Sequence, residues 1–296
     1  MKIGIDLGGT KTEGVLIDSK GKEIKRKRIN TEKNYKGTIK GILSIVYEFE
    51  NEFGNSFSVG IGMPGAVSSD TALIKNANSI WLNGKPLKKD LELELNRKVN
   101  LANDANCFAL SESIDGAGKD EEIVFGVIIG TGVGGGIVIN KKVIEGRNNI
   151  SGEWGHISLP YRSNDEKKYV KDCYCGKTGC IETYVSGPGF SSSFNLRHGT
   201  NYDSYKIIEL YEKSNQNCKE ALIRYVDHLA RGLSIICNIV DPDIIVLGGG
   251  MSNIEFIYDN IDRAMNKYIF SDTFNTKIVR NIHGDSGGVR GAAWLS

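Results

Sequence analysis

Short apolar runs that lead into glycine-rich turns dominate the hydrophobic pattern of the chain. Residues 3–18 predict a strand, a turn and a second strand, and residues 124–140 repeat this plan. Two further apolar runs, 58–62 and 244–247, also lead into turns that contain glycine. This repetition predicts two similar α/β halves.

Helical periodicity is clearest over residues 221–240, where apolar side chains recur at a spacing of about 3.6. Pro242 ends this pattern, because the residue before a proline avoids the helical conformation. A second helix is expected from residue 103, directly after a short strand over 99–102. The tail at 287–295 reads as a short helix that could pack back on the first half of the chain.

The length of 296 residues exceeds the usual size of one hydrophobic core, so two closely packed domains are expected. We predict a smaller N-terminal α/β domain over residues 1–117, joined by a C-terminal helix at about 287–296. A larger α/β domain with a cysteine-rich loop is expected over 118–286.

The composition, with 40% hydrophobic residues, 25% charged residues and a net charge of +1, is that of an ordinary soluble protein. No nucleic-acid partner and no membrane partner are therefore expected. The one basic cluster, residues 22–29, fits an exposed or edge strand with a solvated face, and nucleic-acid binding is the alternative.

The cellular compartment follows from what the sequence lacks. The first six residues contain no apolar core of a signal peptide, and no run is long enough to span a bilayer. Six cysteines are too few for a disulfide scaffold in a chain of this length. These features predict a cytoplasmic protein.

Two glycine-rich turns, at residues 7–11 and 130–136, each lie between two strands. Glycine lets backbone N–H groups approach phosphate oxygens closely. The matched pair predicts a nucleotide between the two halves, with Asp6 on Mg²⁺ and with Thr10 and Lys11 near phosphates. A pair of tight hairpins is the alternative, and neither turn has the Walker or the dinucleotide-binding pattern.

A carboxylate and two amides stand at a strand-to-helix junction, in Asn103, Asp104 and Asn106. Such groups could orient a sugar hydroxyl and accept its proton. Asn and Asp are also ordinary helix caps, so a purely capping role is the alternative.

Four side chains of types that bind zinc occur in one region, namely His156, Cys173, Cys175 and Cys180. Glycines 176 and 179 let the chain turn tightly enough for the three sulfurs to converge. The alternative is a strained disulfide with a spare thiol, and the nearby histidine favours zinc. Glu153 and Glu182 flank this loop, where they could accept hydrogen bonds from sugar hydroxyls or simply be surface acids.

Four segments, in this order along the chain, resemble the motifs of the ROK sugar kinases: Ile5-Asp-Leu-Gly-Gly-Thr-Lys11, Leu101-Ala-Asn-Asp-Ala-Asn106, Gly152-Glu-Trp-Gly-His156 and Cys173-Tyr-Cys-Gly-Lys-Thr-Gly-Cys-Ile-Glu182. The resemblance runs from Lys2 to Leu295. It implies the two-domain, actin-like ATPase (ribonuclease H-like) fold, a cleft that closes on ATP and hexose, and frequent assembly as a homodimer.

The resemblance also assigns roles to residues. It implies that Asp104 is the catalytic base, that Asn103, Glu153, His156 and Glu182 line the sugar, and that His156, Cys173, Cys175 and Cys180 bind a structural Zn²⁺. It places ATP, with Mg²⁺, against residues of the glycine-rich turns and of a third glycine run: Asp6, Gly8, Gly9, Thr10, Lys11, Thr131, Gly132, Gly134, Gly135, Gly248, Gly249 and Gly250.

The sugar is predicted from one further stretch. Residues 75–86 resemble the corresponding stretch of bacterial fructokinases, and Asn76 to Gly84, with Trp81, could form a compact sugar-facing wall. We therefore expect phosphorylation of fructose to fructose 6-phosphate. The alternatives are a glucokinase, a mannokinase, or an N-acetylglucosamine or N-acetylmannosamine kinase, with residues 75–86 as a polar loop that merely differs between branches.

A different class of function is a sugar sensor without catalysis. ROK repressors carry a DNA-binding helix-turn-helix before the kinase-like part, whereas only five residues precede Asp6 here. Asp104 and both glycine-rich turns are intact, which favours an enzyme.

Overall fold

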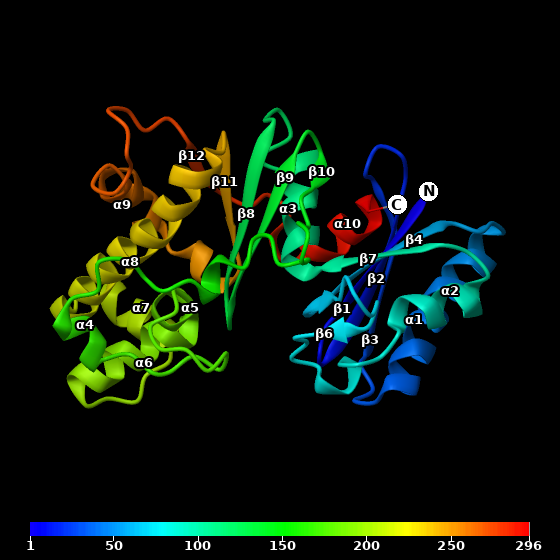
Figure 1. Cartoon of the computed structure of the whole chain (residues 1–296), viewed down its shortest axis with the longest axis horizontal. Helices are drawn as coiled ribbons and strands as arrows, with labels where there is room; N and C mark the ends of the chain where they lie inside the picture. The colour runs from blue at the N-terminus through cyan, green and yellow to red at the C-terminus, as the bar shows by residue number, and fades with distance from the viewer. Residues whose placement is uncertain (296) are drawn as a thin grey trace. The chain divides into compact units, whose positions relative to one another are not determined.

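The computed structural model describes residues 1–295, which form two compact units (Figure 1). Unit 1 contains Met1–Glu122, Gly136–Gly152 and the segment from Ile282 onward. Unit 2 contains Ile123–Gly135 and Glu153–Asn281. The hairpin segment Gly136–Gly152, which we expected in the larger domain, thus belongs to unit 1.

Unit 1 is built on a five-stranded sheet in the order β3-β2-β1-β4-β7. The strands are β1 (Lys2–Leu7), β2 (Lys11–Ile17), β3 (Glu23–Asn30), β4 (Ser58–Met63) and β7 (Val99–Asn103). β2 runs antiparallel to β1 and β3, whereas β4 runs parallel to β1 and β7. The carboxyl ends of β1, β4 and β7 therefore lie at one edge of the sheet, which is where parallel α/β sheets carry their ligands.

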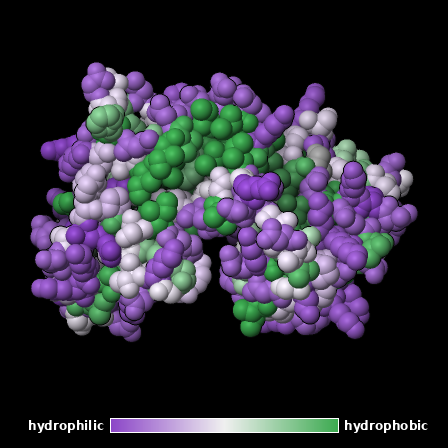
Figure 2. Space-filling view, in the orientation of Figure 1, coloured by the Kyte–Doolittle hydropathy of each residue, from purple (hydrophilic) through white to green (hydrophobic). Residues whose placement is uncertain are grey.

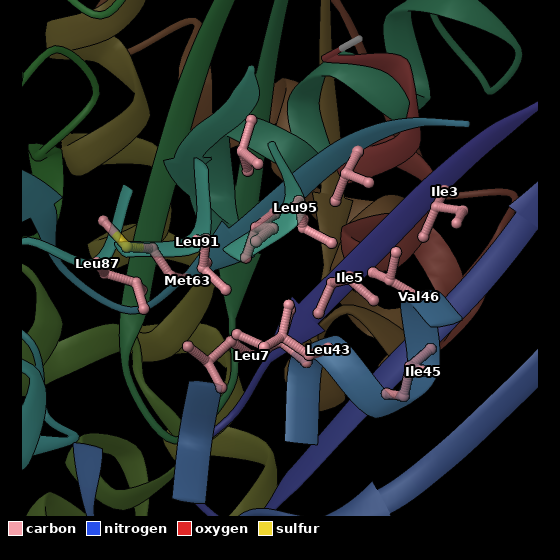
Figure 3. Close-up of a cluster of buried hydrophobic side chains, with 14 of the residues drawn as sticks. Ile3, Ile5, Leu7, Leu43, Ile45, Val46, Met63, Leu87, Leu91 and Leu95 are labelled. Carbon is pink, nitrogen blue, oxygen red and sulfur yellow. The ribbon is translucent and has the colours of Figure 1, made fainter. Parts of the chain in front are cut away.

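One face of this sheet packs on α1 (Tyr35–Phe53) and α2 (Leu87–Leu95). Ile3 and Ile5 of β1 meet Ile45 of α1 and Leu91 of α2 in a single buried cluster (Figure 3). Ile3, Ile5 and Leu91 are each 0% exposed, so this cluster is a true core.

α3 (Asp104–Ile114) and α10 (Gly287–Trp294) pack on each other, and α10 also packs on β1 and β4. α10 lies directly on backbone, because a Cβ added to Gly60 would stand 1.9 Å from the carbonyl oxygen of Ala292. A Cβ on Gly291 would stand 1.6 Å from the carbonyl oxygen of Cys107. The expected C-terminal helix is therefore present on unit 1, and residue 296 lies outside the described residues.

The second five-stranded sheet has the order β10-β9-β8-β11-β12. Its strands are β8 (Ile123–Ile129), β9 (Val133–Ile139), β10 (Lys142–Val143), β11 (Ile244–Gly248) and β12 (Lys277–Arg280). β11 runs parallel to β8 and to β12. β9 begins in unit 2 and ends in unit 1.

The long helix of unit 2 is α8 (Gln216–Val240). It begins at Gln216, five residues before the stretch that showed clear periodicity, and ends at Val240. Asn215 is its N-cap, and the C-cap is Asp241, whose φ is +49°. The other helices of unit 2 are α4 (Asn164–Lys168), α5 (Glu182–Val185), α6 (Gly187–His198), α7 (Ser204–Glu212) and α9 (Glu255–Met265). Shorter elements of the chain are β5 (Ala66–Val67), β6 (Ile74–Lys75), and the 3₁₀ turns η1 (Ile80–Leu82), η2 (Trp154–His156), η3 (Gly250–Asn253) and η4 (Gly284–Ser286).

The basic cluster of the sequence forms the edge strand β3, and its cations pair with carboxylates of the same unit. Arg26 pairs with Glu23 and Glu13, and Arg28 pairs with Glu13. Lys25 and Lys27 pair with glutamates of α1. These ion pairs offset much of the positive charge of the strand, as expected for an edge strand with a solvated face.

The surface carries one broad apolar area in the view of Figure 2, which includes the C-terminal part of α8. Ile239, on the last turn of α8, is 76% exposed. Exposed apolar areas of this kind are typical of contact surfaces, and the expected homodimer stays a prediction. Among residues 1–295, no helix combines the length and the hydrophobicity that crossing a membrane requires.

Candidate functional site

The first glycine-rich turn joins β1 to β2 in unit 1. The N–H of Gly8 donates to the carbonyl of Lys11 at 3.0 Å, and a Cβ on Gly8 would stand 2.8 Å from that oxygen. Lys11 is therefore the first residue of β2, and the turn itself comprises Gly8, Gly9 and Thr10. No described residue accepts a hydrogen bond from the N–H groups of Gly9 and Thr10, which suits them to an anion.

Asp6 lies on β1, directly opposite Glu13 of β2. Burial raises the pKa of Asp6 to about 7, and the charges of Asp104 and Glu13 add to this effect, whereas Arg28 opposes it. The two aspartates that the sequence singled out in unit 1 thus lie near enough to repel each other. A divalent cation would relieve this repulsion, so the residues fit the Mg²⁺ that the sequence predicts.

Asn103 is the N-cap of α3, which is one of the two roles that the sequence left open at this junction. Its Oδ1 accepts from the N–H of Ala105 at 2.9 Å, and its Nδ2 donates to the carbonyl of Gly65 at 3.0 Å. Asp104 is the first residue of α3, where the helix N-terminus favours an ionised carboxylate. Its Oδ1 accepts from the same N–H of Ala105 at 2.8 Å, so both side chains bond to the first turn of the helix.

A cavity of ≈ 200 Å³ opens beside Asn103, entirely within unit 1. It combines apolar walls with amide side chains and two charged residues: Met63, Ala66, Val67, Leu101, Ala102, Asn103, Asn106, Asn149, Lys88 and Glu145. Asn106 is only 7% exposed, and no described residue donates to its Oδ1. The sequence offered no signal for most of this lining, because the residues come from four separate segments, within 63–67, 101–106 and 145–149 and at 88.

The stretch that led us to expect fructose is partly bound to the rest of unit 1. The indole N–H of Trp81 donates to the hydroxyl of Thr38 at 3.0 Å, and the ring, which is partly buried, packs against the core cluster of unit 1. Asn83 bonds to both the N–H and the carbonyl of Ala77, at 2.9 Å each. Asn76, Asn78 and Gly84 are exposed, so the sugar-facing wall stays a prediction, with the Trp81 indole N–H already paired with Thr38.

The second glycine-rich turn lies in unit 2, between β8 and β9. It is shorter than expected, because Gly134 and Gly135 belong to β9 and only Gly130 to Gly132 form the turn. The N–H of Gly130 donates to the carbonyl of Gly132 at 2.9 Å. Thr131 and Gly132 are exposed, so their backbone is open to a ligand.

The third glycine run follows β11, whose last residue is Gly248. Gly249 has a φ of +84°, and a Cβ there would stand 2.6 Å from the carbonyl oxygen of Ile129, so only glycine fits. Its own carbonyl accepts from the N–H of Ser252 at 3.0 Å and from the hydroxyl of Ser252 at 2.7 Å. Gly250 opens η3 and is exposed.

His156, Cys173, Cys175 and Cys180 come together in unit 2, with one ligand atom of each within 4.8 Å of all the others. Nδ1 of His156 lies 3.5 Å from Sγ of Cys173, and Sγ of Cys175 lies 3.6 Å from Sγ of Cys180. A tetrahedron with Zn–S bonds of about 2.3 Å has edges of about 3.8 Å, so these separations suit zinc. The glycines at 176 and 179 have φ of +84° and +81°, as the tight loop requires.

The same cluster is poorly suited to thiolates alone. Burial, together with the neighbouring Cys175 and Cys173, raises the pKa of Cys180 to about 12. Three thiolates therefore need a cation to share the site. Nε2 of His156 lies 3.0 Å from the hydroxyl of Tyr174, so the histidine presents its other nitrogen to the sulfurs.

Glu182 links this cluster to the second glycine-rich turn. Its Oε2 accepts from the N–H of Val133 at 2.9 Å, and the thiol of Cys173 lies 3.8 Å from its Oε1. The other predicted sugar ligand, Glu153, is exposed and directly precedes η2. The sequence proposed Glu182 for the sugar, but nothing in its spacing indicated that it also bonds to the backbone of the turn.

The sequence-predicted residues thus fall into two sets. Asp6, the turn from Gly8 to Thr10, Lys11, Asn103 and Asp104 belong to unit 1. Thr131 to Gly135, Glu153, the metal-type cluster, Glu182 and the run from Gly248 to Gly250 belong to unit 2.

Comparison with known proteins adds relatives that match over the whole chain. A family profile described as "ROK family" matches residues 2–296. An N-acetyl-D-glucosamine kinase from Vibrio atlanticus is 38% identical over 301 residues, which cover 100% of this chain and 99% of that protein.

Solved structures agree with this assignment. The ROK hexokinase from Thermus thermophilus superposes with a TM-score of 0.88 at 26% identity, covering 100% of this chain and 98% of that one. A ROK family glucokinase from Streptomyces griseus, solved in complex with glucose and AMPPNP, gives a TM-score of 0.80 at 26% identity with the same coverage. The actin-like ATPase fold predicted from the sequence is therefore confirmed.

Proposed function

Because the chain belongs to the ROK family, we propose that it transfers the γ-phosphoryl group of ATP to a hexose, with N-acetyl-D-glucosamine as the substrate. The observation that carries the choice of sugar is the 38% identity, over the whole chain, to a relative named N-acetyl-D-glucosamine kinase. Fructose, our expectation from the sequence, is less well supported, because the relative with 38% identity is named for N-acetyl-D-glucosamine, and because the Trp81 indole N–H bonds to Thr38.

The cavity beside Asn103 supports the same choice. An acetamido group is larger than a hydroxyl, and ≈ 200 Å³ of space adjoins the side chain that the family resemblance assigns to the sugar. The apolar walls suit a methyl group, and Asn106 can exchange hydrogen bonds with an amide.

Phosphoryl transfer has a loose transition state, so the protein contributes mainly positioning and charge neutralisation. Asp104 would align the acceptor hydroxyl, the 6-hydroxyl by family resemblance, and take its proton. The N–H groups of Gly9 and Thr10 would hold phosphate oxygens. Mg²⁺, when bound near Asp6, neutralises phosphate charge.

Unit 2 would contribute the remaining acceptors. The carboxylates of Glu153 and Glu182 would accept hydrogen bonds from sugar hydroxyls. His156 would bond to a sugar hydroxyl through Nε2, which lies 3.0 Å from the hydroxyl of Tyr174, in place of that hydroxyl. His156, Cys173, Cys175 and Cys180 would hold zinc, which braces the loop that carries them.

The test is ADP release from ATP with a panel of N-acetyl-D-glucosamine, N-acetyl-D-mannosamine, glucose, mannose and fructose. We expect kcat/KM for N-acetyl-D-glucosamine to exceed that for fructose by about tenfold or more, since each unpaired buried group costs about 1–3 kcal/mol. A higher kcat/KM with fructose would reject the proposed sugar and leave the kinase. Absence of ADP release with every sugar would reject the kinase and favour a sugar sensor.

A further inference from the structure

A buried threonine, Thr31, donates hydrogen bonds to two backbone carbonyls of the first glycine-rich turn, those of Gly8 and Thr10. Thr31 follows β3 and is 9% exposed. Its N–H donates to the carbonyl of Thr10 at 2.9 Å, and its hydroxyl donates to the carbonyl of Gly8 at 2.8 Å. Thr31 thus bonds to the turn twice, once through its backbone N–H and once through its hydroxyl; we call this pair of bonds the Thr31 grip.

A second buried hydroxyl, that of Thr12, bonds to the hydroxyl of Thr31. Oγ1 of Thr12, which is 2% exposed, lies 2.8 Å from Oγ1 of Thr31. A carbonyl can only accept, so the single hydroxyl proton of Thr31 goes to Gly8. Thr12 must therefore donate to Thr31, which forms a chain from Thr12 through Thr31 to Gly8.

This grip sets the direction of the N–H groups in the turn. In a trans peptide the C=O of one residue and the N–H of the next point in opposite directions, and no described peptide bond is cis. Fixing the carbonyl of Gly8 toward Thr31 therefore aims the N–H of Gly9 away from Thr31. Fixing the carbonyl of Thr10 does the same for the N–H of Lys11.

We propose that Thr31 is a positioning residue that pre-orients the N–H groups of Gly9, in the first glycine-rich turn, and of Lys11, the first residue of β2, for nucleotide phosphates. The proposal rests on the proposed role of this turn in binding ATP. Donors that already point at an anion bind it without having to reorganise. Loss of the two bonds from Thr31 should therefore weaken binding of the nucleotide phosphates more than binding of the rest of the nucleotide.

The variants separate the effect of the hydroxyl from that of the size of the side chain. Thr31→Val keeps the shape of the side chain and removes the hydroxyl, Thr31→Ala removes the hydroxyl with less bulk, and Thr31→Ser retains it. The matched control is Thr38→Val. Thr38 is also a buried threonine of unit 1, 3% exposed, but its hydroxyl donates to the carbonyl of Asn34 at 2.9 Å and lies on α1.

The readout is calorimetric binding of a non-hydrolysable ATP analogue with Mg²⁺, and of AMP, to each full-length variant. We expect Thr31→Val and Thr31→Ala to weaken binding of the analogue by about five- to fiftyfold, and binding of AMP by about twofold or less. Thr31→Ser should restore the affinity. Thr38→Val should leave both affinities unchanged although it lowers the melting temperature.

Two results would overturn the inference. One is an unchanged affinity for the analogue in folded Thr31→Val or Thr31→Ala, and the other is an equal loss for the analogue and AMP, which marks a general structural effect. Failure of the wild-type protein to bind the analogue at all would instead reject the nucleotide-binding part of the proposed function.

Discussion

Asp104 is the residue on which the proposed chemistry depends most directly. Asp104→Asn keeps the size of the side chain but removes the proton acceptor, so kcat should fall by about 10² to 10⁴. Helix α3 should persist because Asn103 is its cap. Steady-state kinetics with ATP and N-acetyl-D-glucosamine, together with nucleotide binding by calorimetry, check this.

Asn103→Ala is the structural counterpart, because it removes the cap and should lower stability by about 1 kcal/mol. A folded Asp104→Asn variant that turns over within a few-fold of wild type would show that another group accepts the proton.

The convergence of His156 with the three cysteines was predictable from their motif, whereas the roles of Asp6 and Asp104 stay predictions. Contacts that join distant segments were not predictable. Thr31 bonds to a turn more than twenty positions earlier, and the Trp81 indole N–H bonds to Thr38. Sequence spacing carries no information about such pairings, because tertiary packing decides them.

At the scale of elements, the short helix α4 is tied to the long helix α8 by one carboxylate. Glu166 closes the capping box of α4 with Ser163, and also bonds to His228 at 2.8 Å and to Arg231. Bonds from His228, Arg231 and the Ser163 N–H hold the pKa of Glu166 well below its usual range, although its burial acts in the opposite direction.

Glu166→Gln should therefore destabilise the protein by about 1–3 kcal/mol near neutral pH. The pKa of Glu166 is lower in the folded than in the unfolded protein. Its contribution to the free energy of unfolding is therefore fully present above the unfolded-state pKa and is lost as pH falls toward the folded-state pKa. The difference between variant and wild type should shrink on acidification. Urea unfolding at several pH values measures it.

Glu209→Gln is the control for this experiment. Glu209 also pairs with two cations, Lys206 and Lys213, but on the exposed surface of α7. Exposed pairs contribute about 0–1 kcal/mol, so this variant should stay close to wild type. Equal losses in the two variants would contradict the role of Glu166 as a link between helices.

Elements with strong patterns were predicted well, namely the strand–turn–strand units, α8, the start of α3 and the C-terminal helix. The prediction was weaker where an element is stabilised by context. The glycines at 134 and 135 read as turn residues, yet they lie in β9, because strand pairing overrides the low strand propensity of glycine.

At the scale of the whole molecule, we expect the proposed zinc to stabilise unit 2 and not unit 1. Its four ligands all belong to unit 2, so binding should stabilise that unit by about 4 kcal/mol when free zinc is about 1,000 times its Kd. Metal analysis should find about one zinc per chain. Scanning calorimetry with and without a chelator should shift the unfolding of unit 2 more than that of unit 1.

Cys175→Ser should lose the metal, whereas Cys218→Ser should keep it, because Cys218 is a buried thiol of α8 outside the cluster. Freshly prepared, active protein with far less than one equivalent of zinc would contradict the assignment.

The two-unit architecture itself was predictable from the repeated strand plan and the family resemblance. The assignment of Gly136–Gly152 to unit 1 was not, because the segment follows β9 without any break in composition. Only the contacts of the folded chain, such as the bond from Lys75 to the carbonyl of Asn148 at 3.0 Å, reveal where it belongs.

The close packing of α10 on unit 1 has a consequence for biosynthesis. The first sheet emerges early from the ribosome, but the helix that covers the backbone around Gly60 is made after all of unit 2. Until then, α10 cannot cover its face of the nascent sheet. Unit 1 can therefore complete its folding only after unit 2 has been synthesised, which makes this face a natural binding surface for chaperones.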